Sequence, residues 1–406
     1  MINDDVVIFL IAPNVGEQMG GEAIKALQIF QELKKVHRHT YQITHARNVP
    51  EVRDRLKLDD VFFVEDDWLT MALWRTKVLG FLINSVFSKR AVQLAERKAQ
   101  ELGLADRFVI LHQTEPNSPV TPRSISRRHR NVFGPINGNI YYPAIFRAHE
   151  KLQARIRRIF HMPTQRLNRL LFSDLKKADM ILCAGGDRTR VSLRAAGCPE
   201  AIVRESLDCG IREELLQRPR VTHQGNNPRF LHFGRLVFHK GTALIIESLP
   251  KTRQRICLDI VGRGPELENC QALVARLGLG DRVRFLGWYE SHQDLFASFH
   301  QYRGVLLPSI EDANGIVVQE AMAAGLPPIC LDWGGPQLLV DDGVNGFLIE
   351  PRTRDHITDA IAARLDRLTE DAALAESMSV AARAKAEAWR WPRIIESWSG
   401  LYAQLR

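Results

Sequence analysis

Short apolar blocks alternate along the chain with longer amphipathic stretches, and this pattern predicts strands separated by helices. In the first half, the apolar blocks predict strands at Val6–Ile11, Tyr41–Ala46, Val61–Val64, Phe108–Leu111 and Met180–Ala184. Helical periodicity covers residues 22–35, 68–98, 144–177 and 187–196. Residues 114–143 are rich in proline, glycine and arginine, and the length of this stretch predicts a functional loop.

The same alternation restarts after a polar segment in the middle of the chain. The second half is predicted to hold strands at Arg229–Phe233, Ile256–Val261, Val283–Leu286, Val305–Leu307, Pro328–Leu331 and Phe347–Ile349. Strands and helices that alternate at this spacing form parallel sheets with helices on both faces. Such doubly wound sheets bind ligands at the carboxyl ends of their strands, so the loops that follow the strands are the candidate sites.

Length and pattern together predict two domains. The first spans residues 1–210 and the second spans 229–388, with a polar, turn-rich linker over 211–228 between them. Residues 389–406 carry Trp391, Trp398 and Tyr402, which suits a last helix that packs on a second surface.

The segment that follows Val305–Leu307 carries the strongest candidate chemistry. A loop with two acids, Glu311 and Asp312, leads to a helix that opens at Gly315 and holds a third acid, Glu320. The free N–H groups of a helix start cradle phosphates well, and the acids are placed to flank a ligand held there. A surface loop that happens to carry acids is the alternative.

Two further turns at strand ends carry glycines and cations. The turn from Gly234 to Gly241 holds Arg235 and Lys240, which suit a diphosphate, although two exposed cations on a surface turn would look the same. Gly262-Arg263-Gly264 is weak evidence for a dinucleotide-binding fingerprint. Leu267 stands where that fingerprint has its third glycine, which argues against a dehydrogenase. Leu286, at the end of another strand, is placed to help present backbone groups to a base.

The order of these motifs resembles the retaining glycosyltransferases of family four. The series is Gly-Arg-Leu-x3-Lys-Gly, Val-Gly-x-Gly-Pro, Val-x-Phe-Leu-Gly, Pro-Ser-x2-acid-x2-Gly-x4-Glu-Ala-Met-Ala-x-Gly, Gly-Gly-Pro and Asp-Gly-x-Asn-Gly-Phe-Leu. The likeness is strong over residues 230–350 and thinner in the first half. There it depends on Gly20-Gly21, His112, residues 134–138 and residues 182–197. It implies the GT-B fold, in which two Rossmann-like domains face a cleft and the last helix returns to the N-terminal domain.

The resemblance also implies a role for each matching residue. Arg235 and Lys240 would hold the diphosphate of a nucleotide-sugar donor, and Glu320 would hydrogen-bond the ribose hydroxyls. Backbone N–H groups would reach the phosphates and the sugar from Asn314, Gly315, Ile316 and Val317. Asp312 would touch the sugar hydroxyls, and His112 would lie near the sugar. Gly234, Gly262, Arg263 and Leu286 would complete the donor site, and Gly20-Gly21 would approach the phosphate from the first domain.

Two departures from the family pattern bear on the sugar. Asp312 stands where the family has Glu, so its carboxylate reaches about one methylene less, and the adjacent Glu311 is an alternative. Ala313-Asn314-Gly315 replaces the usual Gly-Phe-Gly. His112 has a structural histidine as its alternative reading. No D-x-D suggests a metal, and the acidic pair Asp66-Asp67 is interpreted as a surface loop.

The distribution of charged residues along the chain bears on the acceptor. Residues 1–210 carry 32 Lys and Arg against 23 Asp and Glu, a net of +9, whereas the remainder has a net of −1. Residues 119–173 alone hold eleven Lys and Arg and one acid, Glu150. Together with the apolar segment Trp68–Phe87, this predicts contact with an anionic membrane surface. No aromatic residues interleave with the arginines, so nucleic acid is a poor alternative.

The function expected from these features is a retaining, metal-independent hexosyltransferase without a cofactor. It would transfer a sugar from a nucleotide-diphosphate sugar to a glycan or a polyprenyl-diphosphate-linked acceptor, in bacterial exopolysaccharide or lipopolysaccharide assembly. The six cysteines form no C-x-x-C pair, which fits reduced thiols in a cytoplasmic, peripherally bound protein. A nucleotide-sugar epimerase of the same architecture and a non-catalytic sugar-nucleotide binder are the alternatives.

Overall fold

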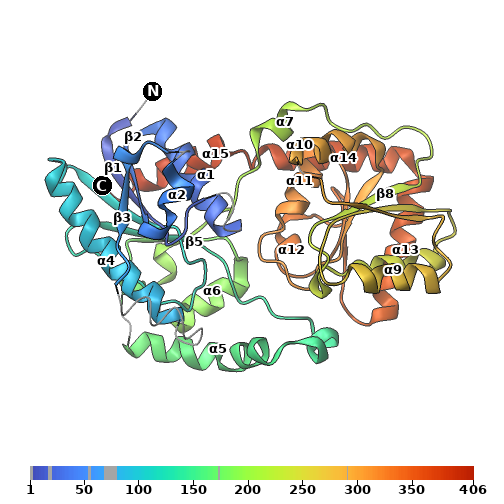
Figure 1. The fold of residues 1–406 in the computed structure, drawn as a ribbon, viewed down its shortest axis with the longest axis horizontal. Coiled ribbons are helices and arrows are strands. Elements are labelled where there is room, and N and C mark those ends of the chain that lie inside the picture. The colour runs from blue at the N-terminus through green and yellow to red at the C-terminus, as the bar shows by residue number, and fades with distance from the viewer. Residues whose placement is uncertain (1–2, 17–20, 54–55, 68–79, 172–173, 290) are drawn as a thin grey trace. The chain divides into compact units, whose positions relative to one another are not determined.

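The structure is a computed structural model that describes residues 3–16, 21–53, 56–67, 80–171, 174–289 and 291–406. Its internal contacts divide the chain into two compact units (Figure 1). Unit 1 comprises Met1–Asn139, Ile156–Cys209 and Trp391–Arg406, and unit 2 comprises Ile140–Arg155 and Gly210–Arg390.

Unit 1 is built on a seven-stranded parallel sheet in the order β3-β2-β1-β4-β5-β6-β7. Its strands are β1 (Asn3–Ile11), β2 (His37–His45), β3 (Val61–Val64), β4 (Phe108–Gln113), β5 (Arg130–Ile136), β6 (Met180–Cys183) and β7 (Val203–Glu205). Its helices are α1 (Gly21–Val36), α2 (Val49–Arg53), α4 (Gly80–Glu101), α5 (Leu152–Leu171), α6 (Gly186–Ala195) and α15 (Trp391–Ala403). The first four residues of α5 are counted with unit 2.

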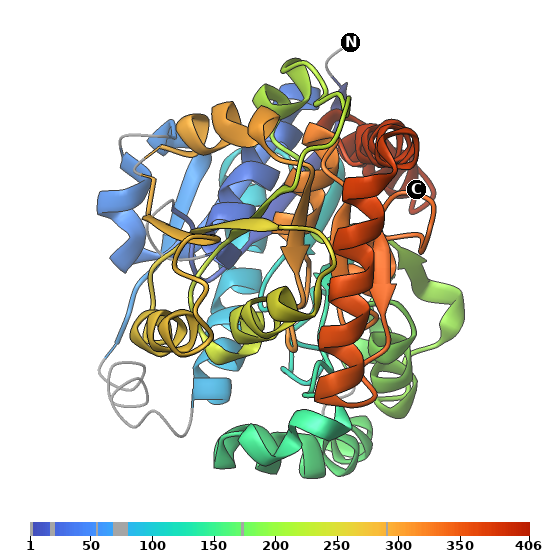
Figure 2. The same cartoon turned by 90° about the vertical axis from the view of Figure 1, so that its right-hand side faces the viewer.

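Unit 2 is built on a six-stranded parallel sheet in the order β10-β9-β8-β11-β12-β13. Its strands are β8 (Arg229–Phe233), β9 (Cys257–Val261), β10 (Val283–Gly287), β11 (Gly304–Leu307), β12 (Pro328–Leu331) and β13 (Phe347–Ile349). Its helices are α7 (Glu213–Gln217), α8 (Thr242–Ser248), α9 (Leu267–Arg276), α10 (His292–Ser298), α11 (Ile316–Ala324), α12 (Pro336–Leu339), α13 (Arg354–Glu370) and α14 (Ala372–Glu387). Figure 2 turns this unit toward the viewer, with helices in front of its sheet.

The apolar strand blocks form the cores, as the alternation predicts. In unit 1, Val7, Phe9 and Leu111 of the central strands are fully buried, and in unit 2 Leu258 and Leu306 are fully buried. Central parallel strands are covered on both faces, and this explains why their sequences are apolar runs. Two doubly wound parallel sheets, with the last helix on the first unit, confirm the predicted fold class.

Two strands and several segments differ from the predictions. Strand β7, which pairs with β6, was not predicted, because a run of three residues is too short to show a strand pattern. The predicted loop 114–143 contains β5, a central strand that pairs with β4 and β6. Gly134 and Pro135 obscure it, because both residues weaken a strand pattern. Residues 140–155 belong to unit 2, where Phe146 packs into the core, although the prediction assigned them to the first domain.

The predicted linker 211–228 packs within unit 2. Leu215 and Leu216 of α7 are buried, and the N–H of Val221 donates to the carbonyl of Ala324 at 2.9 Å. A polar composition suggested a free connector here, but the few apolar side chains in it are enough to anchor the segment.

In the apolar segment Trp68–Phe87, Ile83 and Phe87 differ from the expectation of an exposed surface. Its residues 68–79 lie outside the described ranges. Ile83 and Phe87, on α4, are 8% and 2% exposed, and Phe87 packs in the core of unit 1. These two side chains therefore contribute to the fold and not to a surface.

Candidate functional site

The candidate site lies where the strand order of unit 2 reverses. The chain runs from β8 outward to β10, then returns to β11 beside β8 and continues outward on the other side. Loops at such a reversal diverge and leave a crevice at the carboxyl ends of the two strands. The loops that follow β8 and β11 touch here, because the N–H of Ile310 donates to the carbonyl of His239 at 2.7 Å.

Lys240 and Asp312 join these two loops. The Lys240 ammonium lies 2.6 Å from Oδ2 of Asp312, and Oδ1 of Asp312 accepts from the N–H of Gly315 at 3.0 Å and of Asn314 at 3.3 Å. Burial alone would raise the pKa of Asp312, but Lys240 and the two N–H groups lower it below its usual value. An ionised carboxylate therefore holds a cation at the entrance of α11.

The start of α11 offers further donors beside this pair. Gly315 adopts a left-handed conformation with φ of 64°, and the helix begins at Ile316. The N–H groups of Ile316 and Val317 lie in the first turn, where no carbonyl four residues earlier in the helix is available to them. Arg235 is exposed on the opposite loop. Lys240 and the free N–H groups of this helix start lie close together, which suits an anionic group.

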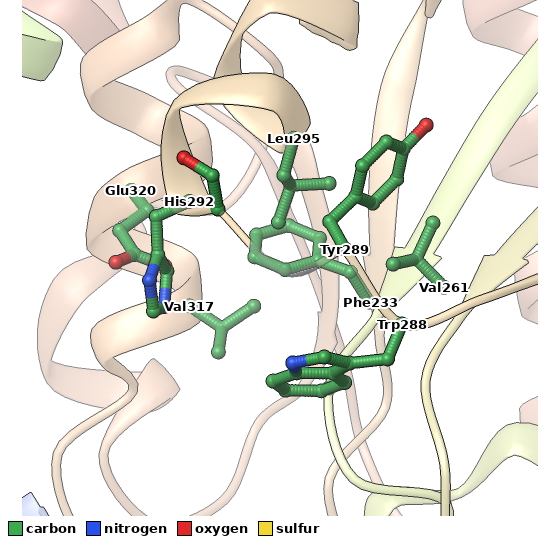
Figure 3. A pocket seen from close by; sticks show the side chains of 10 residues that line it. Phe233, Val261, Trp288, Tyr289, His292, Leu295, Val317 and Glu320 are labelled. Carbon is green, nitrogen blue, oxygen red and sulfur yellow. The ribbon is translucent and has the colours of Figure 1, made fainter.

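A pocket opens beside this point (Figure 3). The space between its lining side chains is about 470 Å³, including the part open to solvent. Glu320 and Val317 line it from α11, His292 and Leu295 line it from α10, and Trp288 lines it from the segment after β10. Burial raises the pKa of Glu320 to about 7, while Arg212 acts in the opposite direction. The pocket thus combines an aromatic face with an acid.

The remaining predicted donor residues of unit 2 have different positions. Gly234 lines the pocket, and a Cβ at Gly262 would lie 2.1 Å from the Gly234 carbonyl oxygen, so a glycine there lets the two loops approach. Arg263 is exposed. Leu286 is 39% exposed on β10 and does not line the pocket. Glu311 is half-buried. The pKa of Tyr142 is raised, first by the burial of Tyr142 itself and then by the negative charge of Glu311.

His112 is held by the fold of unit 1. Its ring is fully buried, with Nδ1 2.7 Å from the Tyr402 hydroxyl and Nε2 2.7 Å from the Gly134 carbonyl oxygen. Burial lowers its pKa to about 4, although the Gly134 contact acts against this, so the imidazole is neutral. Both nitrogens are engaged, and these contacts favour the structural alternative over a place beside the sugar.

The two predicted glycines of unit 1 are adjacent in sequence. Gly20 lies outside the described residues. Gly21 begins α1, and among the described residues no atom outside its chain neighbours and its own helix backbone lies within 4 Å of the position that a Cβ would occupy there. The approach of Gly21 to a phosphate stays a prediction.

Sequence reasoning missed two groups of residues. Trp288 and Tyr289 line the pocket, and an aromatic pair just after a strand end is the signal that was available. In unit 1, the buried Lys25 ammonium donates to Asn117 Oδ1 at 2.6 Å and to Asp208 Oδ1 at 2.9 Å. Glu115 is buried near it, and burial raises the pKa of this carboxyl to about 8. These positions are distant in sequence, so no local pattern connects them. Among the described residues, no group of three His, Cys, Asp or Glu side chains is placed to hold a metal ion.

Two doubly wound parallel units, with the last helix on the first, define the GT-B architecture of glycosyltransferases. Solved structures of this architecture match nearly the whole chain. The Anabaena protein Alr3699/HepE in complex with UDP and glucose has a TM-score of 0.62 at 18% identity, covering 98% of this chain and 100% of that one. The lipopolysaccharide outer core galactosyltransferase WaaB in its apo form has a TM-score of 0.67 at 16% identity, covering 98% and 99%.

The second unit also resembles a known family in its sequence. Residues 214–385 match the family described as Glycosyl transferases group 1. The candidate pocket and the loops around Lys240 and Asp312 lie within the matched residues.

Curated relatives match over the same half. The GDP-mannose-dependent alpha-(1-6)-phosphatidylinositol monomannoside mannosyltransferase of Mycobacterium tuberculosis is 34% identical over 196 residues, 45% of this chain and 49% of its own. The D-inositol 3-phosphate glycosyltransferase of Streptomyces griseus is 33% identical over 176 residues, 41% of this chain and 35% of its own. The chain thus spans half or less of the length of the curated relatives it matches.

Proposed function

We propose that the chain is a retaining glycosyltransferase that needs no metal. It moves a sugar from a nucleoside-diphosphate sugar to a hydroxyl of a glycan or of a polyprenyl-diphosphate-linked glycan. Its proposed setting is bacterial exopolysaccharide or lipopolysaccharide assembly in the cytoplasm. The observation that carries the proposal is the joint position of Lys240, the start of α11 and the Glu320 pocket at the strand reversal of unit 2.

Each part of this site suits one part of a nucleotide-sugar. The aromatic face of Trp288 suits a base, and the Glu320 carboxylate suits the paired ribose hydroxyls, which donate hydrogen bonds. The start of α11, Arg235 and Lys240 suit the diphosphate. The pocket adjoins the start of α11, because Val317 lines it from the first turn of that helix.

The cations also serve the chemistry. When the bond between the sugar and the diphosphate breaks, negative charge develops on the leaving diphosphate, and preorganised positive groups stabilise it. Lys240 is paired with Asp312 when no ligand is present. Donor binding must therefore bring the diphosphate into competition with Asp312 for this ammonium, and Asp312 is then placed to accept from a sugar hydroxyl.

Retention of the sugar's configuration is proposed to follow from attack on the leaving-group face. The acceptor oxygen bonds to the anomeric carbon, the bond to the diphosphate breaks, and a phosphate oxygen takes the acceptor proton. This route needs no enzyme nucleophile, in contrast to a double displacement.

A transfer assay tests the proposal. The protein is incubated with UDP-glucose or GDP-mannose, because neighbours and relatives carry UDP or GDP-mannose in their names. A short-chain polyprenyl-diphosphate N-acetylglucosamine or an alkyl glycoside serves as acceptor, with and without EDTA. We expect a glycosylated product with the donor's anomeric configuration in both conditions, strongly reduced in Lys240→Met and retained in Lys251→Met, a lysine paired with Asp359 elsewhere in unit 2.

Other products would contradict the proposal in distinct ways. An inverted anomer would exclude the retaining route, and loss of product with EDTA would exclude metal independence. A donor sugar with an inverted ring hydroxyl and no transfer would favour an epimerase. Nucleotide binding without any product would favour a non-catalytic binder.

A further inference from the structure

Helix α5 packs against unit 1 through its polar side chains. His161 Nε2 lies 2.8 Å from Ser192 Oγ on α6, and Gln165 Nε2 donates to the same oxygen at 2.6 Å. Asn168 Nδ2 donates to the Val120 carbonyl at 2.9 Å. His161 and Gln165 are buried in this contact, where α5 lies beside α6 (Figure 1). The buried side chains of α5 are the polar His161 and Gln165, so hydrogen bonds attach this helix to the described part of unit 1.

The apolar side chains of α5 point the other way. Seven of them are between 47% and 80% exposed: Leu152, Ile156, Ile159, Phe160, Leu167, Leu170 and Leu171. Their spacing of three, four and seven residues places them on one stripe of the helix. A helix on a globular protein usually turns such a stripe inward. The stripe of α5 is turned outward, and contiguous exposed apolar surface of this kind marks an interaction site.

The charges on α5 identify the kind of partner. Its sequence holds Arg155, Arg157, Arg158, Arg166 and Arg169 and no acid. At 100° per residue, Arg155 and Arg166 lie along one edge of the apolar stripe, and Arg157 lies along the other. A helix with an apolar face bordered by cations suits the boundary between headgroups and acyl chains of an anionic bilayer. A second copy of this chain would bring two cationic helices together, which is unfavourable.

We infer that the outward face of α5, from Ile156 to Leu171, is a docking surface for an anionic lipid bilayer. The apolar side chains enter the headgroup boundary, and the arginines contact lipid phosphates. One amphipathic helix gives reversible binding. The inference goes beyond the proposed transfer reaction and does not depend on it, because vesicle binding needs neither donor nor acceptor.

Co-sedimentation of the full chain with vesicles tests this surface. We expect binding to vesicles of phosphatidylglycerol and phosphatidylcholine and weak binding to phosphatidylcholine alone. Ile159→Ser combined with Leu167→Ser should lower the partition coefficient by roughly tenfold or more, because two apolar side chains no longer leave water. Val344→Ser combined with Val380→Ser, which are 57% and 51% exposed in unit 2, is the matched control and should leave binding unchanged.

A charge series completes the test. Arg155→Gln combined with Arg166→Gln should weaken binding to anionic vesicles severalfold, whereas the same change at the exposed Arg276 and Arg393 should not. Binding should also weaken near 1 M salt, where the screening length is about 3 Å.

Three results would overturn the inference. The first is that the wild type does not bind anionic vesicles at low salt. The second is that the variant with Ile159→Ser and Leu167→Ser binds as well as the Val344→Ser and Val380→Ser control. The third is that sedimentation velocity shows a dimer, and that only the Ile159→Ser and Leu167→Ser variant is a monomer. The last result would assign the face to a second copy of the chain.

Discussion

The carboxyl group of Glu320 is tuned toward its neutral form. Burial raises its pKa to about 7, with Arg212 acting against the shift. Ribose hydroxyls donate hydrogen bonds, and an ionised carboxylate accepts them more strongly than a protonated one. The unliganded protein must therefore release a proton from Glu320 before it binds ribose well.

This gives a pH dependence with a defined sign. The affinity for a nucleoside should rise as pH increases through about 7, and below that value it should fall by up to about tenfold per pH unit. Calorimetric titration with guanosine or uridine measures this without the ionisation of a phosphate. In Glu320→Gln the slope should disappear, and an unchanged slope would assign the titration to another group.

Lys240 is expected to discriminate between a nucleoside and its diphosphate. Lys240→Met should weaken binding of a nucleoside diphosphate by about 10- to 100-fold, since a hydrogen bond between charged groups contributes about 1.5–3 kcal/mol. Nucleoside affinity should be unchanged, because the pocket lining does not include Lys240. Titrations with UDP and uridine, or GDP and guanosine, give the comparison. Equal losses for both ligands would place Lys240 away from the phosphates.

At the scale of elements, the contact between the two site loops depends on Gly241. This residue has φ of 72°, and a Cβ added to it would lie 2.2 Å from the Pro308 carbonyl oxygen. Gly278, at the end of α9, has φ of 66° with open space around it. Both therefore carry the backbone cost of a left-handed residue, about 1–2 kcal/mol, and only Gly241 adds a clash between loops.

The two alanine substitutions separate these effects. Gly241→Ala should lower the free energy of unfolding by at least about 1 kcal/mol more than Gly278→Ala, because the loop after β8 must move away from β11. It should also weaken nucleotide binding, which Gly278→Ala should leave intact. Urea titration and calorimetry measure both quantities. Equal unfolding free energies would mean that the loops adjust without cost.

The elements of unit 2 were predictable because its pattern is regular. Arg229–Phe233, Pro328–Leu331 and Phe347–Ile349 have the predicted bounds, since each is a short apolar run between turn residues. Unit 1 was harder to predict. Strand β5 carries Gly134 and Pro135, and its place is fixed by pairing with β4 and β6, which a local pattern cannot reveal.

The candidate site was predictable to a similar extent. The sequence placed Lys240 and Asp312 in loops that follow strands of one sheet and Glu320 in the helix after Asp312, and the structure brings the two loops together. Their roles toward a donor remain predictions. The sequence did not reveal the ion pair between Lys240 and Asp312, nor the hydrogen bonds that enclose His112, because both depend on residues far apart in the chain.

At the scale of the whole molecule, the last helix belongs to the first unit. Trp398 Nε1 donates to Ser206 Oγ at 3.0 Å, and the Tyr402 hydroxyl contacts His112. Helix α15, from the last residues of the chain, therefore packs as part of unit 1. No described helix is long and apolar enough to cross a membrane.

Tyr402→Phe tests the structural role of His112. Loss of the hydroxyl leaves Nδ1 of a buried imidazole without this partner, which should cost about 1–3 kcal/mol of unfolding free energy. The turnover number should stay near the wild-type value, because this pair holds no substrate. Tyr41→Phe, whose ring stacks on Phe9 in the same unit, is the control. A large fall in turnover with unchanged stability would give His112 a catalytic role.

Nucleotide binding in unit 2 is the central claim, and a thermal-shift panel tests it most directly. The wild type, Glu320→Ala and the control Glu268→Ala, an exposed acid on α9, are each measured with UDP, GDP, ADP and CMP. A ligand at a hundred times its Kd stabilises the native state by about 2.7 kcal/mol. We predict a higher Tm with one nucleotide in the wild type and in Glu268→Ala, and its loss in Glu320→Ala. No shift with any nucleotide, or the same shift in Glu320→Ala, would contradict the account.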